Sequence, residues 1–190
     1  MKLKKQYEAT FAGFGGQGIM TAGQLLAYAG IAEGKQVVWI PSYGPEMRGG
    51  TAYCTVVVSD KRIGSPIISN PQCACVFNRP SLDKFAPKVK SDGLLVINSS
   101  LIDVKSDRVD IQQILVPAND IAIELGNPKV ANVIVLGAFI GASKVVSLDT
   151  LKSTITEKLA RKKSVLDLNL TAVQRGYDLS AKSQRQKEKA

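Results

Sequence analysis

The 190-residue sequence contains no histidine. It therefore lacks the side chain that most often transfers protons near neutral pH and that is also the commonest zinc ligand. No pair of carboxylates is placed so that it could take over this work. The sequence thus predicts no catalytic residue of its own and indicates a binding or assembly component rather than a self-sufficient catalyst.

Cysteine is also scarce, with three residues and no Cys-x-x-Cys pair. Three thiols do not make a disulfide framework, and their spacing does not suit a structural zinc site or an iron–sulfur cluster held by this chain alone. Cys73 and Cys75 stand two apart in a short apolar segment, so in a strand both would face the same side of a sheet. We therefore interpret them as buried thiols and expect no metal site in this chain.

Long hydrophobic runs are missing too. The most apolar run, residues 131–142, has 12 residues, whereas a membrane-spanning helix needs about 20. Residues 1–5 are basic with no apolar segment behind them, so we expect no signal peptide, no membrane contact and a cytoplasmic protein. Aromatic residues do not alternate with the basic ones, so the net charge of +9 indicates a solvated surface and no nucleic-acid site.

Apolar segments with the periodicities of strands and helices alternate along the chain. Strands are expected at residues 8–13, 37–40, 51–59, 73–78, 94–97 and 111–116, the second of them buried, with a return strand beginning at residues 63–64. Helices are expected at residues 19–29, 80–85, 119–124, 131–142 and 149–163. This order is typical of a single α/β domain, residues 1–180, with a mostly parallel sheet flanked by helices. Residues 181–190 are expected to form a basic, frayed C-terminal tail.

The most informative segment is Gly13-Phe14-Gly15-Gly16-Gln17-Gly18, which gives the domain a Rossmann-like start of strand, glycine loop and helix. Free amides at a helix N-terminus can bind a phosphate group. The acidic residue that would hold a dinucleotide ribose after the second strand is absent, and so is the lysine of a nucleoside-triphosphate loop. Two interpretations remain, a tight turn alone or a loop that contacts an anion or another backbone.

A second loop follows the next strand, with the sequence Pro41-Ser42-Tyr43-Gly44-Pro45-Glu46-Met47-Arg48-Gly49-Gly50-Thr51-Ala52. Because the carboxyl ends of parallel strands meet at one edge of a sheet, we expect both loops there. Tyr43, Glu46 and Arg48 are the residues of this loop capable of directed chemistry. The alternative is a local ion pair between Glu46 and Arg48 that only holds the loop.

With both loops in view, the chain resembles the gamma subunit of the 2-oxoacid:ferredoxin oxidoreductases over roughly residues 8–175. The matching segments are residues 13–18, 42–50, 63–66 and 126–132, the last leading into Leu136-Gly137. Residues 43–50 are the specific part, because that segment is long and of unusual composition.

The resemblance implies an enzyme that oxidatively decarboxylates a 2-oxoacid with coenzyme A, yields an acyl-CoA and carbon dioxide, and passes electrons to ferredoxin. It implies thiamine diphosphate and iron–sulfur clusters on companion alpha, beta and delta subunits or domains, with no cofactor bound by this chain alone. The segments are most similar to those of 2-oxoglutarate enzymes, so 2-oxoglutarate is the favoured substrate.

The glycine loop and the resemblance together suggest that coenzyme A binds at the interface of the complex. The expected contacts are Gly13, Gly15, Gly16, Gln17, Gly18 and Arg48. In the alternative the loop packs on another subunit. Two other functions stay open, a stand-alone nucleotide-binding or regulatory module and a purely structural docking subunit.

Three asparagines form a second candidate group. Asn119 is predicted to cap a helix and Asn127-Pro128 to form a turn. Asn132 opens the apolar helix and needs a partner if it is buried, which makes it a candidate ligand or interface residue.

Overall fold

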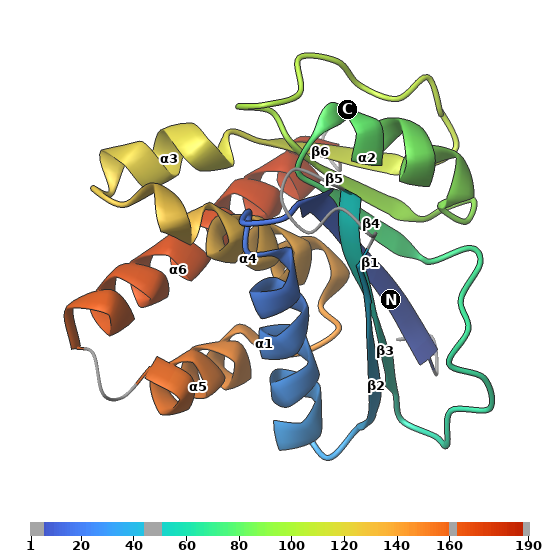
Figure 1. Ribbon diagram of the computed structural model, residues 1–190, viewed down its shortest axis with the longest axis horizontal. Coiled ribbons are helices and arrows are strands. Elements are labelled where there is room, and N and C mark those ends of the chain that lie inside the picture. Colours follow the sequence, from blue (N-terminus) through green and yellow to red (C-terminus); the bar gives the residue numbers. More distant parts are fainter. Residues whose placement is uncertain (1–5, 44–50, 160–162, 188–190) are drawn as a thin grey trace.

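A six-stranded sheet forms the centre of the computed structural model, which describes residues 6–43, 51–159 and 163–187 (Figure 1). The strands are β1 (Gln6–Phe14), β2 (Gln36–Tyr43), β3 (Thr51–Ser59), β4 (Cys73–Val76), β5 (Leu94–Asn98) and β6 (Gln112–Val116). Their order across the sheet is β2-β3-β1-β4-β5-β6. β1, β4, β5 and β6 are parallel, and β3 is antiparallel to both β1 and β2. The predicted mostly parallel sheet is confirmed.

Helices cover both faces of this sheet (Figure 1). One face carries α1 (Ile19–Ala32), α4 (Ala131–Ser143), α5 (Leu148–Leu159) and α6 (Lys163–Lys187), and the other carries α2 (Arg79–Phe85) with the short η1 (Ala86–Lys88). α3 (Ala118–Glu124) and η2 (Pro128–Val130) connect β6 to α4. None of the helices described is both long and apolar enough to cross a lipid bilayer.

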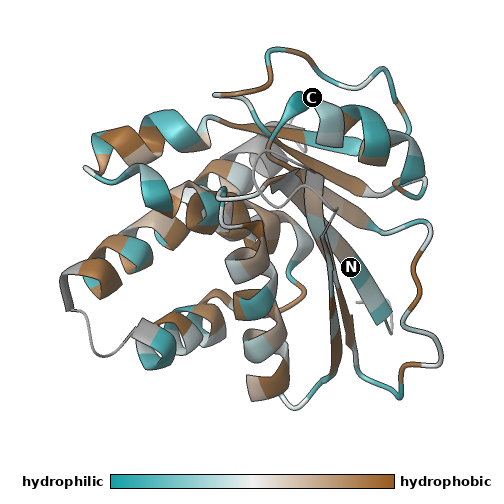
Figure 2. Ribbon diagram, viewed as in Figure 1, coloured by the Kyte–Doolittle hydropathy of each residue, from teal (hydrophilic) through white to brown (hydrophobic). Residues whose placement is uncertain are grey.

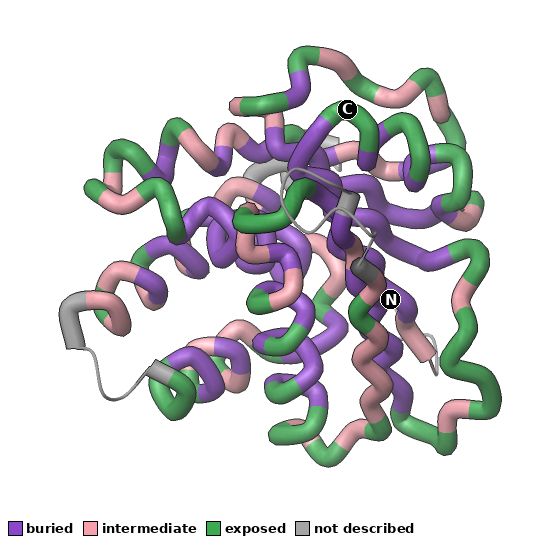
Figure 3. The backbone as a smooth tube through the Cα atoms, viewed as in Figure 1, coloured by how far each residue is buried: buried purple, intermediate pink, exposed green. Residues whose placement is uncertain are grey.

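The apolar runs of the sequence form the centre of the sheet. All residues of β4 and β5 are buried, because helices cover both sides of these strands (Figure 3). Cys73 and Cys75 share the α1–α4 face, and Ala74 and Val76 face α2. The predictions of a doubly buried strand near residues 94–97 and of buried thiols on one face are confirmed.

α4 is the most deeply buried helix, apolar around its circumference (Figure 2). Its Phe139 packs edge-on against Phe11 of β1, with ring centroids 5.7 Å apart. On its other side it meets α6 backbone to backbone. A Cβ atom at Gly137 would overlap the carbonyl oxygen of Val173, and one at Gly176 would overlap that of Ile134. These glycines therefore permit the close approach of the two helices.

Three local predictions are wrong. The second strand is a half-buried edge strand, because β2 has a neighbour on only one side. No return strand follows residues 63–64, and the chain is irregular from there to β4. Asn119 does not cap α3, because the N-cap of that helix is Pro117. The Oδ1 of Asn119 instead accepts a hydrogen bond from Nδ2 of Asn98, 2.8 Å away.

Candidate functional site

A cleft of about 870 Å³ opens beside the carboxyl end of β1. Its walls come from the glycine loop, from the exposed side of α1, from the segment that leads into α4, and from the facing ends of α5 and α6. Among the described residues that line it, Lys129 and Lys158 are the charged ones, and none is an aspartate or a glutamate. The cleft is thus suited to a ligand of negative charge.

The glycine loop forms one end of this cleft. Gly16 and Gly18 have φ angles of 96° and 73°, in the left-handed region that favours glycine. A Cβ atom at Gly16 would meet no atom within 4 Å, so the backbone there faces open space. Gly16, Gln17 and Gly18 all line the cleft.

Gln17 fastens the loop to the sheet. Its Oε1 accepts a hydrogen bond from the backbone N–H of Phe14 at 2.6 Å, and its Nε2 donates to the carbonyl oxygen of Phe77 at 3.3 Å. A Cβ atom at Gly13 would lie 2.5 Å from the same Oε1 and 2.9 Å from Cβ of Phe77. Gly13 lies in β1, and its lack of a side chain makes room for the side chain of Gln17. Gly15 lies exposed in the loop.

Two helix N-termini point at the cleft. α1 begins at Gly18 and α4 begins after Val130, and neither first turn has a side-chain cap or an acidic residue. The helix dipoles favour an anion at such ends, while the first N–H of α4, that of Ala131, donates to the carbonyl oxygen of Pro128 in the preceding turn η2. Gly18, Ala131 and Val133 line the cleft, so both first turns contribute to one site.

Asparagines join the elements around the cleft. Oδ1 of Asn98 accepts from the backbone N–H of Ala118 at 3.3 Å, which fixes the start of α3 to the end of β5. Oδ1 of Asn127 accepts from the N–H of Lys129 at 2.9 Å, which confirms the predicted turn. Asn132 is 5% exposed; its Nδ2 donates to the carbonyl oxygen of Gly18 at 3.0 Å.

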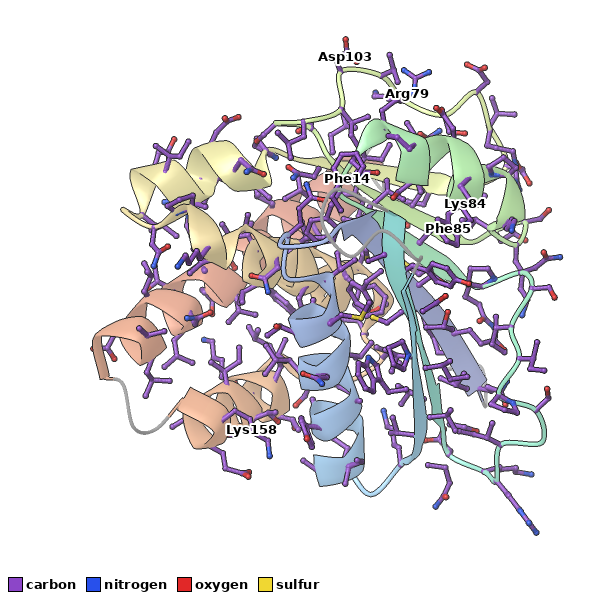
Figure 4. All side chains as sticks on the ribbon, in the orientation of Figure 1. Phe14, Arg79, Lys84, Phe85, Asp103 and Lys158 are labelled. Carbon is purple, nitrogen blue, oxygen red and sulfur yellow. The ribbon has the colours of Figure 1, made fainter. Side chains whose placement is uncertain are left out.

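The far end of the cleft is formed by Tyr28 and Lys158. The Lys158 ammonium lies 3.9 Å from the centre of the Tyr28 ring. Figure 4 shows Phe14 beside the start of α1 and Lys158 on α5, next to the C-terminal half of α1. Ten helical residues separate Gly18 from Tyr28, so the cleft extends over about 15 Å. It has room for an elongated ligand.

The second loop is described only at its ends. Phe14 of β1 pairs with Thr51 and Tyr43 of β2 pairs with Ala52, so both loops leave the sheet at the same edge, as predicted. Arg48 and Glu46 lie outside the described residues.

Sequence reasoning missed Tyr28, Lys129 and Lys158 as parts of this site. Tyr28 and Lys158 lie outside the segments that carry the resemblance, and Lys129 lies inside residues 126–132 but was not singled out; the packing of α4 and α5 beside α1 brings all three to the cleft. A helical wheel of α1 offers a partial signal, because Thr21, Gln24 and Tyr28 recur on its exposed side.

Known proteins share both the sequence and this fold. Residues 8–179 match the family described as pyruvate ferredoxin/flavodoxin oxidoreductase. Ketoisovalerate oxidoreductase subunit VorA of Methanothermobacter marburgensis is 37% identical over 94% of this chain and 37% of its own length. 2-Oxoglutarate synthase subunit KorC of Methanocaldococcus jannaschii is 32% identical over 94% of this chain and 96% of its own length. The chain thus spans little more than a third of the VorA proteins, 37% and 35% of those from two Methanothermobacter species.

Solved structures agree with the sequence comparison. The gamma subunit of a keto/oxoacid ferredoxin oxidoreductase from Geobacter sulfurreducens is 28% identical, with a TM-score of 0.82 over 93% of this chain and 97% of that one. A 2-oxoglutarate:ferredoxin oxidoreductase from Magnetococcus marinus, solved with 2-oxoglutarate, coenzyme A and succinyl-CoA bound, is 26% identical. Its TM-score is 0.85, over 93% of this chain and 31% of that one.

Proposed function

The chain belongs to the pyruvate ferredoxin/flavodoxin oxidoreductase family, and we propose that it is the gamma subunit of a 2-oxoacid:ferredoxin oxidoreductase. The complex would oxidise and decarboxylate a 2-oxoacid with coenzyme A and pass the electrons to ferredoxin. Thiamine diphosphate and the iron–sulfur clusters would reside on alpha, beta and delta partners. This division of labour agrees with a chain that has no histidine and no Cys-x-x-Cys pair. Its own task is assembly and the binding of coenzyme A.

The proposed 2-oxoacid is 2-oxoglutarate. In support, the 2-oxoglutarate synthase subunits of three methanogens match this chain along nearly their whole length, 96% to 98%. The VorA proteins are more similar in sequence, and a pyruvate synthase subunit is 32% identical, so ketoisovalerate and pyruvate are the competing substrates.

The proposed coenzyme A site is the cleft between α1 and α4. The observation that carries it is the meeting of two uncapped helix N-termini and two lysines in a cleft with no carboxylate among its described lining residues. Coenzyme A has a pyrophosphate and a ribose phosphate that such a site can hold. Its thiol supplies the acyl acceptor when it is bound.

The residues present fit this ligand. The open space above Gly16 leaves room for a phosphate against the backbone, and the Asn132 side chain has a buried oxygen with no partner. Gly15, Gly16 and Gly18 would offer backbone contacts, and Lys129 would add charge. Arg48 remains a proposed contact from the second loop.

The decisive experiment is purification of the tagged chain from its native cells, followed by mass spectrometry and viologen reduction with each of the three 2-oxoacids. The proposal expects a thiamine-diphosphate subunit, an iron–sulfur subunit and activity that requires coenzyme A and 2-oxoglutarate. Activity with only ketoisovalerate or only pyruvate would show that 2-oxoglutarate is the wrong substrate, and the chain would still be a gamma subunit. A chain that is recovered alone and binds an adenine nucleotide would instead be the stand-alone module.

Replacement of Gly16 by valine in the assembled enzyme tests the site. The side chain would enter the space above the loop at a φ of 96°, and we expect the apparent KM for coenzyme A to rise about tenfold or more. Gly34→Val is the matched control, because Gly34 also has a positive φ, 73°, and open space around it, but lies at the far end of α1. Equal coenzyme A kinetics in the two variants would refute binding at the loop.

A further inference from the structure

The first turns of α1 and α4 are tied together by one side chain. Nδ2 of Asn132, in the first turn of α4, donates to the carbonyl oxygen of Gly18, the N-cap of α1. The contact is close, since a Cβ atom at Gly18 would lie 2.6 Å from that Nδ2. Asn132 thereby sets the distance between the two helix N-termini that line the cleft.

The other end of the same amide has no partner. Because Gly18 offers an acceptor, Nδ2 must face it, and Oδ1 is therefore the atom left over. Within the described part of the chain, Oδ1 of Asn132 is buried and makes no hydrogen bond. An unsatisfied buried acceptor is destabilising, so such a group is rare unless another molecule completes it.

Other polar side chains of the cleft differ in this respect. Asn98 uses both amide atoms, on Asn119 and on the N–H of Ala118, and Asn169 donates to the carbonyl oxygen of Val165. Of the buried side-chain atoms that lack a partner in the described residues, only Oδ1 of Asn132 belongs to a residue of the cleft. The missing partner is thus located at the junction of the two helices.

We infer that Asn132 positions the two helix N-termini around the phosphates of the ligand and accepts a hydrogen bond from a hydroxyl or amino group of the same molecule. Inorganic phosphate or pyrophosphate can interact with the helix N-termini but lacks the hydroxyl and amino donors of a nucleoside. A phosphorylated nucleoside carries both kinds of group a few ångströms apart. The inference rests on the proposed function, because coenzyme A is such a molecule.

The test is Asn132→Asp in the assembled enzyme, with Asn78→Asp as the matched control. Asn78 is equally buried, at 4% exposed, also lies at a helix N-terminus, and also has one unpaired amide atom, but it is outside the cleft. A carboxylate interacts favourably with the dipole at a helix N-terminus, which offsets part of the cost of its burial in both variants. In Asn132→Asp the new carboxylate repels the phosphates of the ligand, and one of its oxygens faces the carbonyl oxygen of Gly18 in place of the donor Nδ2. We expect the Kd of coenzyme A to rise about tenfold or more, with kcat retained at saturation and no such change in Asn78→Asp.

A second variant, Asn132→Ala, separates donor recognition from charge. It introduces no charge and removes the acceptor, so the Kd of coenzyme A should rise more than the inhibition constant of inorganic pyrophosphate. Equal losses for both probes would overturn recognition of a donor group. Wild-type affinity in Asn132→Asp, beside a raised KM in Gly16→Val, would overturn the role of Asn132 and leave the proposed function intact. If neither Asn132→Asp nor Gly16→Val affected coenzyme A binding, both the role of Asn132 and the proposed coenzyme A site would be wrong. If Asn132→Asp prevented assembly but left coenzyme A binding normal, Asn132 would be a subunit contact instead.

Discussion

Gly16 and Gly18 share a backbone conformation but are glycines for different reasons. At Gly18 a side chain would collide with Asn132, so packing and the positive φ both demand glycine. At Gly16 only the φ angle demands it, and the space beyond is free. Within a single turn, one glycine therefore permits a contact inside the protein and the other leaves the backbone accessible from outside.

The cysteines give a prediction at the same scale. Burial raises the pKa of Cys54 to about 12 and that of Cys73 well above its ordinary value. The Sγ atoms of Cys73 and Cys75 lie 3.9 Å apart on one strand, and all three thiols are buried. Because the thiolate is the reactive form, the folded chain should react very slowly with a thiol reagent near pH 8.

The measurement is colorimetric thiol titration of the folded chain and of the chain in denaturant. Three thiols should react after unfolding, and none rapidly before it. Fast modification of even one thiol in the folded chain would show that this core opens readily.

Among the helices, the contact of α4 with α6 depends on small residues. Gly176→Ala would place a methyl group on the carbonyl oxygen of Ile134, and backbone atoms cannot rotate away as side chains do. We expect a loss of about 3 kcal/mol or more in the free energy of unfolding. Thr171→Ala, at an exposed position of the same helix, should change it by less than about 0.5 kcal/mol. Urea denaturation followed by circular dichroism distinguishes the two, and equal midpoints would contradict close backbone packing.

The contact with α4 also explains why the sequence did not predict α6. The strands and α4 were predictable because their buried residues form apolar runs. α6 is buried along Asn169, Ala172, Val173, Gly176 and Ser180, a stripe that is mostly small or polar. The segment is polar on average although its buried residues have helical spacing, and only its basic end is predicted from the sequence, as a tail.

The candidate site was predictable to a similar degree. The glycine loop, the shared edge of the two loops and the need of Asn132 for a partner follow from local sequence and from the rule for parallel sheets. The convergence of α1 and α4 on one cleft does not, because it depends on how helices more than 100 residues apart pack. The resemblance to gamma subunits, stated from four short segments, is confirmed by the family match and by the fold.

For the whole molecule, a charged clip joins distant parts of the chain. Oε1 of Glu33, at the end of α1, accepts from the N–H of Ser147 at 2.6 Å, and its Oε2 lies 2.9 Å from Nζ of Lys35. Lys35 in turn donates to the carbonyl oxygen of Val145. Burial works to raise the pKa of Glu33, but the Ser147 N–H and the Lys35 ammonium outweigh it and lower that pKa below the ordinary 4.5.

A lowered pKa in the folded chain means that the unfolded chain binds the proton more readily. The clip is therefore fully stabilising above pH 4.5, and its contribution is lost as the pH falls from there through the lowered value. Glu33→Gln should lower the free energy of unfolding by about 1 kcal/mol at pH 7. It should also reduce the loss of stability with falling pH below pH 4.5. Glu157→Gln, at an exposed ion pair, is the control, and identical pH–stability curves for the two variants would disprove the role of the clip.

The glycine contacts between α4 and α6 also have a mechanical consequence. α6 has 25 residues and is about 37 Å long, and at Gly137 and Gly176 the backbones of α4 and α6 are in direct contact. Because neither backbone can shift without the other, we expect the two helices to move together. A partner subunit that displaced α6 far from the cleft would also displace Asn132 on α4. Binding of that subunit and binding of a ligand in the cleft would then be coupled through the direct contact of the two helix backbones.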